Sequence, residues 1–103
     1  MSAPSPEVVP RAEKDLSCDY RAPSTEVEHT LVRMWRQHLN VEPIGVDDDF
    51  FELGGHSLLA ADLLVATEDA VGVRVPARTL YLQPTIAELA EAIDRLRGQA
   101  APA

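Results

Sequence analysis

The sequence predicts an all-α domain: a small four-helix bundle of three main helices and one short helix, with a long first loop. Apolar residues recur at helical spacing in three separate segments, and no segment shows the apolar–polar alternation that is typical of a strand. Aromatic residues, which strands favour, make up only 5% of the chain. The chain has 103 residues, 46% of them hydrophobic, which is enough for one domain around one core.

The first helix is expected to begin at Ser24 or Thr25, because Thr25 and Glu28 have the spacing of a capping box. Asn40 is a plausible end, since a proline follows three residues later. The apolar stripe of this helix comprises Leu31, Met34, Trp35 and Leu39.

Residues 41–56 form a long loop that carries apolar residues of its own, and such a loop is usually packed down and often functional. The three aspartates at 47–49 fit no calcium-binding pattern, so they are expected to form a solvated acidic turn. The loop residues expected to be buried are Ile44, Val46, Phe50, Phe51 and Leu53.

Three further helices follow the loop. The second helix is expected over residues 57–71 and ends at Gly72. A short helix is expected at about 78–82, and the last helix begins at Thr85, with a second capping box to Glu88. The apolar stripe of the last helix comprises Ile86, Leu89, Ala90, Ile93 and Leu96.

The two ends of the chain are expected to lie outside the folded domain. Residues 1–23 hold four of the eight prolines and show no apolar period, so they are predicted to be a flexible tail or linker. Residues 24–97 are predicted to form the folded domain, and residues 98–103 a flexible C-terminal tail. The initial Met1 and the tail-like start favour a free-standing protein, with a domain excised from a larger one as the alternative.

Composition excludes several functional classes. A formal net charge of −8 argues against nucleic acid and against an anionic membrane surface as partners. A single cysteine, Cys18, allows neither an internal disulfide nor a cysteine metal cluster. His29 and His38 are spaced wrongly for a shared metal and are expected at the surface. The start of the chain lacks a signal peptide and no window could span a bilayer, so a cytoplasmic location is expected.

The loop ends in Gly54-Gly55-His56-Ser57, and Ser57 opens the second helix. The two glycines allow a close approach, while the helix start offers unpaired N–H groups that favour a phosphate on the hydroxyl. The alternative is that Ser57 is only an N-cap, which is the commonest reason for a serine before an apolar helix. A hydrolase nucleophile is excluded, because the residue two positions on is Leu59 and not glycine.

The second helix also carries apolar residues outside its core face. Leu58, Ala61 and Val65 lie on an arc that also contains Asp62. This arc is either a shallow docking patch ringed by carboxylates or part of a central helix that is apolar most of the way round.

The string VDDDFFELGGHSLLA, residues 46–60, resembles the core motif of peptidyl carrier (thiolation) domains of nonribosomal peptide synthetases. The segment Tyr20-Arg21-Ala22-Pro23 is similar to the family's entry into its first helix, and residues 73–76, 80–81 and 84–90 resemble its last segments. The resemblance covers about residues 20–96 and implies an acyl-carrier-like four-helix fold.

The resemblance also implies a cofactor and a set of partners. A phosphopantetheinyl transferase would attach 4′-phosphopantetheine from coenzyme A to Ser57. The carrier would then tether an aminoacyl or peptidyl group as a thioester and shuttle it between enzymes of nonribosomal peptide biosynthesis, an antibiotic-type pathway. Those partners are an adenylation enzyme or domain and condensation, tailoring or thioesterase enzymes. The chain itself would be a monomer with no metal and no catalytic role.

Residue by residue, the resemblance makes Ser57 the attachment point, while Gly54, Gly55 and His56 shape the approach to it. The expected docking surface comprises Leu58, Ala61, Asp62, Val65, Leu80 and Tyr81. The histidine before the serine favours a peptidyl carrier, because acyl carriers of polyketide and fatty acid synthesis usually have an aspartate there. The stretch at 66–70 contains none of the basic residues that peptidyl carriers often have late in this helix, which bears on the identity of the partner and not on the modification. Two rival classes stay open: an acyl carrier of polyketide or fatty acid synthesis, and a binding module in which Ser57 is merely a cap.

Overall fold

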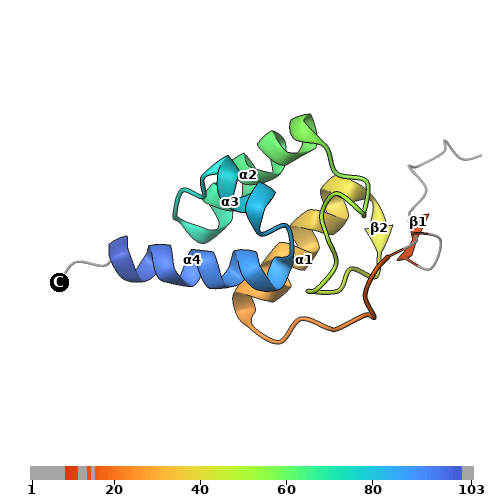
Figure 1. Ribbon diagram of the computed structural model, residues 1–103. Coiled ribbons are helices and arrows are strands. Elements are labelled where there is room, and N and C mark those ends of the chain that lie inside the picture. Colours follow the sequence, from red (N-terminus) through yellow and green to blue (C-terminus); the bar gives the residue numbers. More distant parts are fainter. Residues whose placement is uncertain (1–8, 12–13, 15, 101–103) are drawn as a thin grey trace, which may run out of the picture.

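The computed structural model describes residues 9–11, 14 and 16–100, with only the backbone for residues 99 and 100. Its four helices are α1 (Glu26–Leu39), α2 (Ser57–Val71), α3 (Ala77–Leu82) and α4 (Ile86–Ala100). Helix α1 packs against α2 and α4, and the short helix α3 also contacts both α2 and α4 (Figure 1). The predicted bundle of three main helices and one short helix is confirmed.

The loop between α1 and α2 contributes a large part of the core. Phe50 is fully buried and meets Trp35 of α1 edge to face, with ring centroids 5.4 Å apart. Burial of the loop residues is confirmed for four of the five predicted ones. The exception is Phe51, which is 37% exposed and stacks on Tyr81 of α3. The loop therefore belongs to the packed body of the domain.

The predicted capping box at Thr25 is confirmed, whereas the one at Thr85 is present only in part, because the Glu88 carboxylate meets the Thr85 hydroxyl and not the Thr85 amide. At α1 the Glu28 amide donates to the Thr25 hydroxyl at 3.0 Å, and the Glu28 carboxylate accepts from the Thr25 amide at 3.1 Å. At α4 the Glu88 amide reaches Thr85 Oγ1 at 3.3 Å, and the Thr85 hydroxyl bonds to the Glu88 carboxylate. These contacts satisfy amides that a helix start leaves unpaired.

Two short strands correct the expectation of a purely helical chain. Strand β1 (Val9–Pro10) pairs in parallel with β2 (Val41–Glu42), and the Val9 amide also donates to the Asn40 carbonyl at 2.8 Å. Each strand has only two residues, so neither gives the alternating pattern by which a strand is recognised in a sequence. The ladder nevertheless fastens the N-terminal segment to the end of α1.

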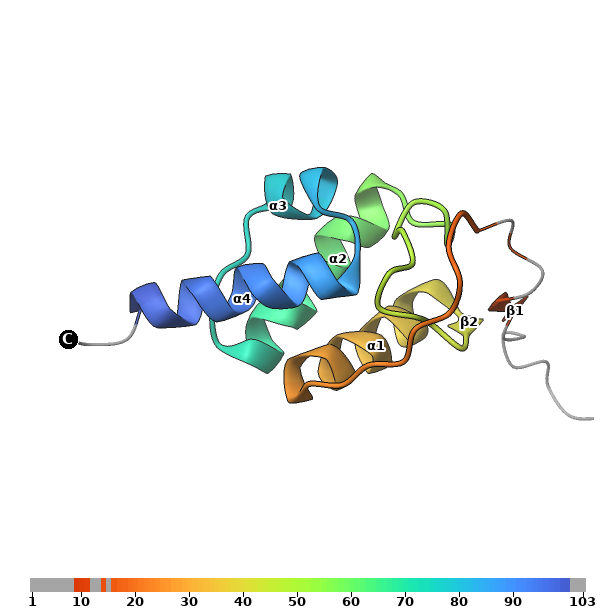
Figure 2. The same ribbon diagram turned by 60° about the horizontal axis from the view of Figure 1, so that its bottom comes forward.

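The described residues before α1 differ from the predicted flexible tail. We call residues 9–11, 14 and 16–23 the strap, because they run alongside the 41–56 loop before α1 begins (Figure 2). Arg11 forms an ion pair with Asp48, and Arg21 forms one with Asp47. The Val46 amide donates to the Arg21 carbonyl at 2.9 Å. These polar contacts hold the strap, together with Val9 and Leu16, which pack against the core. Such scattered contacts produce no apolar period, so the strap could not be recognised in the sequence. Residues 1–8, 12, 13 and 15 of the predicted tail lie outside the described residues.

The C-terminal boundary also differs from the prediction. Helix α4 continues to Ala100, past the predicted start of the tail at residue 98. Neither Gln99 nor Ala100 interrupts a helix, and the first proline comes only at Pro102. Residues 101–103 lie outside the described residues.

Candidate functional site

Ser57 is the first residue of α2, and its side chain is exposed. The N-cap is His56, with φ −147° and ψ 177°, and its side chain makes no capping hydrogen bond. Within the described part of the chain, the Ser57 hydroxyl makes no hydrogen bond either. The prediction that Ser57 is the N-cap of α2 is therefore wrong, because His56 occupies that position.

The start of α2 favours a negatively charged group. The first turn of the helix contains no acidic residue, and neither His56 nor Ser57 caps its amides. The unpaired N–H groups and the positive end of the helix dipole lie at this end. A phosphate attached at Ser57 would be stabilised by both.

The two glycines before Ser57 are required by the local geometry. Gly54 has a φ of +106°, a conformation that residues with a side chain rarely adopt. A Cβ on Gly55 would lie 2.2 Å from Cε2 of Phe50, closer than any real contact. The Gly55 amide also donates to the Phe50 carbonyl at 2.9 Å. The glycine pair thus lets the chain pass over the Phe50 ring and enter α2.

Phe50 is also bonded to the segment that precedes α4. Its amide donates to the carbonyl of Pro84 at 2.7 Å, just before α4. Asp49 forms an isolated bridge with Thr85, and its carboxylate accepts from the Phe51 amide at 2.7 Å. The approach to Ser57 is therefore fixed between the strap on one side and the α3–α4 connection on the other.

Asp48 corrects the prediction of a solvated acidic turn, because its side chain is fully buried. It accepts hydrogen bonds from Arg11 Nη2 at 2.7 Å, Arg11 Nε at 2.9 Å and the Gly45 amide at 2.8 Å. Burial on its own would raise the pKa of Asp48, but the hydrogen bonds from Arg11, Gly45 and the Cys18 thiol outweigh it and leave the pKa lowered. Asp48 is therefore an ionised anchor for the strap.

Cys18 lies in the same cluster, with Sγ 3.2 Å from the Asp48 carboxylate and 3.2 Å from the Asp47 carbonyl. Burial and the neighbouring Asp48 carboxylate raise the pKa of the Cys18 thiol. A raised pKa favours the neutral thiol, whose single proton lies between the Asp47 carbonyl and the Asp48 carboxylate, so Cys18 is part of the contact between the strap and the loop.

The predicted docking residues fall into two groups. Leu58 and Val65 are 69% and 65% exposed, and the remaining exposed members are Ala61, Asp62 and Tyr81. Leu80 corrects the prediction: it is fully buried in the core and belongs to no surface.

Two further exposed apolar residues, Leu82 and Phe51, were missed by sequence reasoning. Leu82, two positions after Leu80, is 72% exposed, and Phe51 stacks on Tyr81 with centroids 5.5 Å apart. A six-residue helix is too short for its period to tell which leucine points inward.

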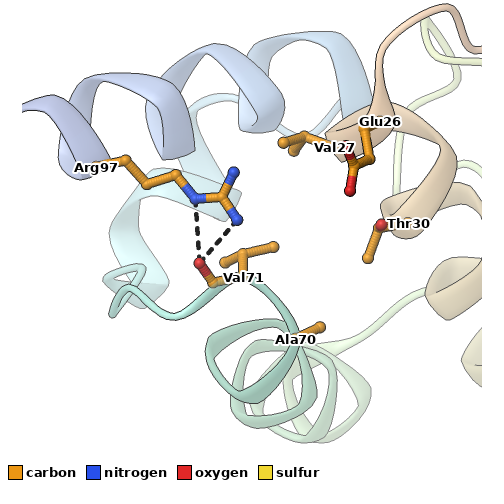
Figure 3. A pocket seen from close by; sticks show the side chains of 6 residues that line it. All are labelled: Glu26, Val27, Thr30, Ala70, Val71 and Arg97. Atoms are coloured by element: carbon orange, nitrogen blue, oxygen red, sulfur yellow. Dashed lines mark hydrogen bonds between the residues drawn. The ribbon is translucent and has the colours of Figure 1, made fainter.

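A small cavity of about 120 Å³ lies at the far end of α2. Figure 3 shows Arg97 of α4 donating two hydrogen bonds to the carbonyl of Val71, at 2.9 and 3.1 Å, with Glu26 and Thr30 of α1 opposite. Helix α2 is 15 residues long, so its two ends are about 21 Å apart at the rise of an α-helix. The cavity is therefore not part of the site at Ser57.

The described residues hold neither a metal centre nor a membrane span. No group of three or more histidine, cysteine or acidic side chains among them is arranged to hold a metal ion. No helix in the described part of the chain is both long enough and apolar enough to cross a membrane.

Comparisons with known proteins place this geometry in a family. The family described as "Phosphopantetheine attachment site" matches residues 29–93. One linear gramicidin synthase polypeptide of Brevibacillus parabrevis is 50% identical over 78 residues, which are 76% of this chain and 2% of that protein. Tyrocidine synthase 2 of the same organism is 45% identical over 85 residues, which are 82% of this chain and 2% of that protein. The chain thus spans only a small fraction of these relatives.

Solved structures that resemble this chain include a peptidyl carrier protein and part of a nonribosomal peptide synthetase. The chain resembles a peptidyl carrier protein in complex with the phosphopantetheine transferase Sfp and coenzyme A, with a TM-score of 0.72 and 37% identity over 74% of this chain and 99% of that one. It also resembles part of a four-domain nonribosomal peptide synthetase, holo-AB3403, with a TM-score of 0.74 and 40% identity over 77% of this chain and 6% of that one. The chain belongs to the phosphopantetheine-attachment family. Within it, the relatives define a peptidyl carrier of the nonribosomal peptide synthetase type.

Proposed function

We propose that this chain carries 4′-phosphopantetheine on Ser57 and presents a tethered aminoacyl or peptidyl group to partner enzymes. The observation that supports it best is the exposed hydroxyl at the first position of α2, which has no hydrogen-bond partner among the described residues. When attached, the arm supplies a terminal thiol on which the aminoacyl or peptidyl group is held as a thioester.

The surroundings of Ser57 fit a phosphodiester. The first turn of α2 holds no carboxylate that would repel a phosphate. The glycine pair lets the chain pass over the Phe50 ring on its way to Ser57, since a Cβ on Gly55 would lie 2.2 Å from that ring. The chain's own residues hold the loop in place through the Phe50 and Gly55 amides, so that the backbone at Ser57 is presented in a defined position.

The attachment step needs a partner enzyme. Among the described residues no imidazole or carboxylate accepts a hydrogen bond from Ser57, so we infer that the general base for that hydroxyl comes from the transferase. In the proposed step Ser57 Oγ forms a bond to the pantetheine-bearing phosphorus of coenzyme A, and adenosine 3′,5′-bisphosphate leaves. The hydroxyl proton passes to a base of the transferase. The chain therefore acts as a substrate and carrier and not as a catalyst.

We further propose the partners and the surface they use. Relatives are solved with the transferase Sfp, in an adenylation–carrier complex with phenylalanyl-adenylate and in a thiolation–reductase pair. For this chain we infer a transferase, an adenylation enzyme or domain and a consuming condensation, tailoring or thioesterase enzyme. The docking face comprises Phe51, Leu58, Ala61, Val65, Tyr81 and Leu82. A cytoplasmic location and a monomeric state stay predictions.

Intact-protein mass tests the proposal. The chain is incubated with coenzyme A, magnesium and a broad-specificity phosphopantetheinyl transferase. Wild type and the matched control Ser17→Ala, which removes another exposed serine, should each gain one phosphopantetheinyl unit. Ser57→Ala should gain none. A folded wild type that gains no mass would overturn the proposed function. Loading by an amino-acid-activating enzyme, and not by an acyl transferase, then separates a peptidyl carrier from an acyl carrier.

A further inference from the structure

The strap contacts the attachment site from outside the segment that matches the family. That segment covers residues 29–93, whereas the strap ends at residue 23. The strap nevertheless lies on the 41–56 loop, which leads directly into Ser57. Its side chains contact the loop at several points, with Arg11 at Asp48, Ser17 at Glu52 and Arg21 at Asp47. The strap is therefore a feature of this chain whose effect on Ser57 the family match does not describe.

The Arg11–Asp48 ion pair is a buried contact between the strap and the loop. Its side chains are 15% and 0% exposed, and Arg11 donates to the carboxylate twice, at 2.7 and 2.9 Å. The Arg21–Asp47 pair has a similar geometry, but its side chains are 53% and 43% exposed. Breaking an exposed pair costs little, whereas removing one partner of a buried pair leaves the other charge uncompensated. The loop therefore has to rearrange when Arg11 is lost, and it does not when Arg21 is lost.

Asp48 connects this ion pair to the backbone of the loop. Its carboxylate accepts from the Gly45 amide at 2.8 Å, and its own amide donates to the Gly45 carbonyl at 3.2 Å. Without Arg11 the carboxylate would keep the Gly45 amide and the Cys18 thiol as donors, but it would lose its cation. A buried carboxylate without a cation is unfavourable, so it would turn toward water and carry the 45–48 turn with it.

A short path connects this turn to Ser57. Phe50 follows Asp48 by two residues, and its carbonyl accepts from the Gly55 amide at 2.9 Å. Gly55 in turn precedes Ser57 by two residues and lies against the Phe50 ring. The bond from the Phe50 amide to Pro84 opposes a displacement, so a shifted turn should change how Ser57 is presented without unfolding the domain.

We propose that Arg11 is a positioning residue for the attachment step, which holds the strap on the loop in the arrangement that the transferase recognises. The inference rests on the attachment proposed for Ser57. Arg11 does not act on the reacting atoms, since its effect reaches Ser57 through Asp48 and the loop. When the strap opens, only a fraction of the molecules present Ser57 in the recognised arrangement. The apparent affinity for the transferase then falls by that fraction.

The kinetics of phosphopantetheine transfer to the full chain test the inference. Rates are measured by intact mass at saturating coenzyme A, with the carrier concentration varied. Arg11→Gln should raise the KM for the carrier about tenfold and leave kcat unchanged, as expected if about one molecule in ten keeps the strap closed. Arg11→Lys retains the charge but not the paired hydrogen bonds, so its KM should be intermediate. Arg21→Gln is the matched control, because it removes the same group from the exposed pair, and should keep the wild-type KM.

A wild-type KM in Arg11→Gln would overturn the inference, and so would equal KM values in Arg11→Gln and Arg21→Gln. The fluorescence of the buried Trp35 shows that each variant is folded. If Arg11→Gln does not fold, Arg11→Lys is compared with Arg21→Lys by the same criterion. A wild type that gains no mass would instead overturn the function proposed for Ser57, so the two failures are distinguishable.

Labelling of Cys18 shows separately whether the strap opens. Cys18 is the single cysteine, and its sulfur lies 3.2 Å from the Asp47 carbonyl and 3.2 Å from the Asp48 carboxylate. Opening frees it from both contacts, so iodoacetamide should label Arg11→Gln several-fold faster than wild type. Loss of the guanidinium alone would slow labelling, because Arg11 lowers the pKa of the thiol. Faster labelling with a wild-type KM, or unchanged labelling, would each overturn the inference.

Discussion

Gly55 lies directly against the ring of Phe50, so that a methyl group on Gly55 would come within 2.2 to 2.6 Å of three atoms of that ring. Phe50 cannot easily give way, because it is fully buried beside Trp35 and its amide is bonded to Pro84. Packing of the core therefore requires a glycine at position 55, two residues before Ser57.

Gly55→Ala should consequently displace the loop from the Phe50 ring. We expect a loss of about 1–3 kcal/mol in the free energy of unfolding, the usual cost of overpacking, together with slower transfer of phosphopantetheine to Ser57. Denaturant unfolding and the rate of mass gain measure the two effects. Gly98→Ala is the control, since nothing lies within 4 Å of its added Cβ. A Gly55→Ala protein with wild-type stability and loading would contradict this account of the loop.

Ser57→Ala should abolish attachment and leave stability unchanged. An N-cap serine would contribute roughly 1 kcal/mol, but Ser57 is the first helical residue and its hydroxyl has no partner among the described residues. We expect the free energy of unfolding to change by less than about 0.5 kcal/mol. A loss near 1 kcal/mol in thermal or denaturant unfolding would show that the hydroxyl caps the helix in solution.

Leu58→Asp and Val65→Glu should weaken partner enzymes while the fold stays intact. Both side chains are more than half exposed, so their loss removes little from the core. A charge at the centre of an apolar contact should lower the loading rate by an adenylating enzyme about tenfold. Gln37→Glu adds the same charge to an exposed position of α1 and should load normally. If Leu58→Asp and Val65→Glu were loaded at the wild-type rate, the exposed face of α2 would not be a docking surface.

Leu80 and Leu82 form a matched pair on α3. Leu80 is fully buried and Leu82 is 72% exposed. Leu80→Ala should lower the free energy of unfolding by about 2–5 kcal/mol, whereas Leu82→Ala should change it by less than about 0.5 kcal/mol. For binding to a partner enzyme we expect the opposite order, with the larger loss in Leu82→Ala, because only Leu82 is exposed for contact. Equal destabilisation by the two substitutions, measured in urea, would contradict the orientation of α3.

The helices could be predicted because their sequence patterns involve residues only a few positions apart. Thr25 with Glu28 and Thr85 with Glu88 are three residues apart, and a capping box requires nothing more distant. The glycine pair and Ser57 were recognisable for the same reason. The sequence could not show whether Ser57 is the N-cap or the first residue of α2. The backbone conformation of His56 decides this, because His56 is extended and occupies the N-cap position.

Contacts between distant residues could not be predicted in this way. Arg11 and Asp48 are 37 positions apart, and nothing near either residue marks it as one half of a buried pair. The aspartates at 47–49 have the composition of a solvated turn, yet the strap covers the middle one. Leu80 and Leu82 were ambiguous because α3 has fewer than two turns. The missed features are thus those that depend on how separate segments meet.

The Arg11–Asp48 pair predicts how stability depends on pH. The pKa of Asp48 is lowered in the folded chain, so its ionised form stabilises the fold at every pH above the unfolded value of about 3.9. This contribution should be constant near neutrality and should disappear as the pH falls below about 4, through the folded pKa. Asp48→Asn should lower the free energy of unfolding by about 3 kcal/mol at pH 7, because it breaks a buried ion pair. The stability of this variant should also fall less steeply than that of wild type as the pH is lowered.

Unfolding between pH 7 and pH 3, followed by the fluorescence of the buried Trp35, measures both effects. Asp47→Asn is the control, because Asp47 makes a similar pair with Arg21 but is exposed, so its removal should have little effect at neutral pH. If wild type and Asp48→Asn lost stability in parallel as the pH fell, the carboxylate of Asp48 would not be the group that fastens the strap. Hydrogen exchange of the amides at Val9 and Val46 would then have to identify which of the remaining contacts holds it.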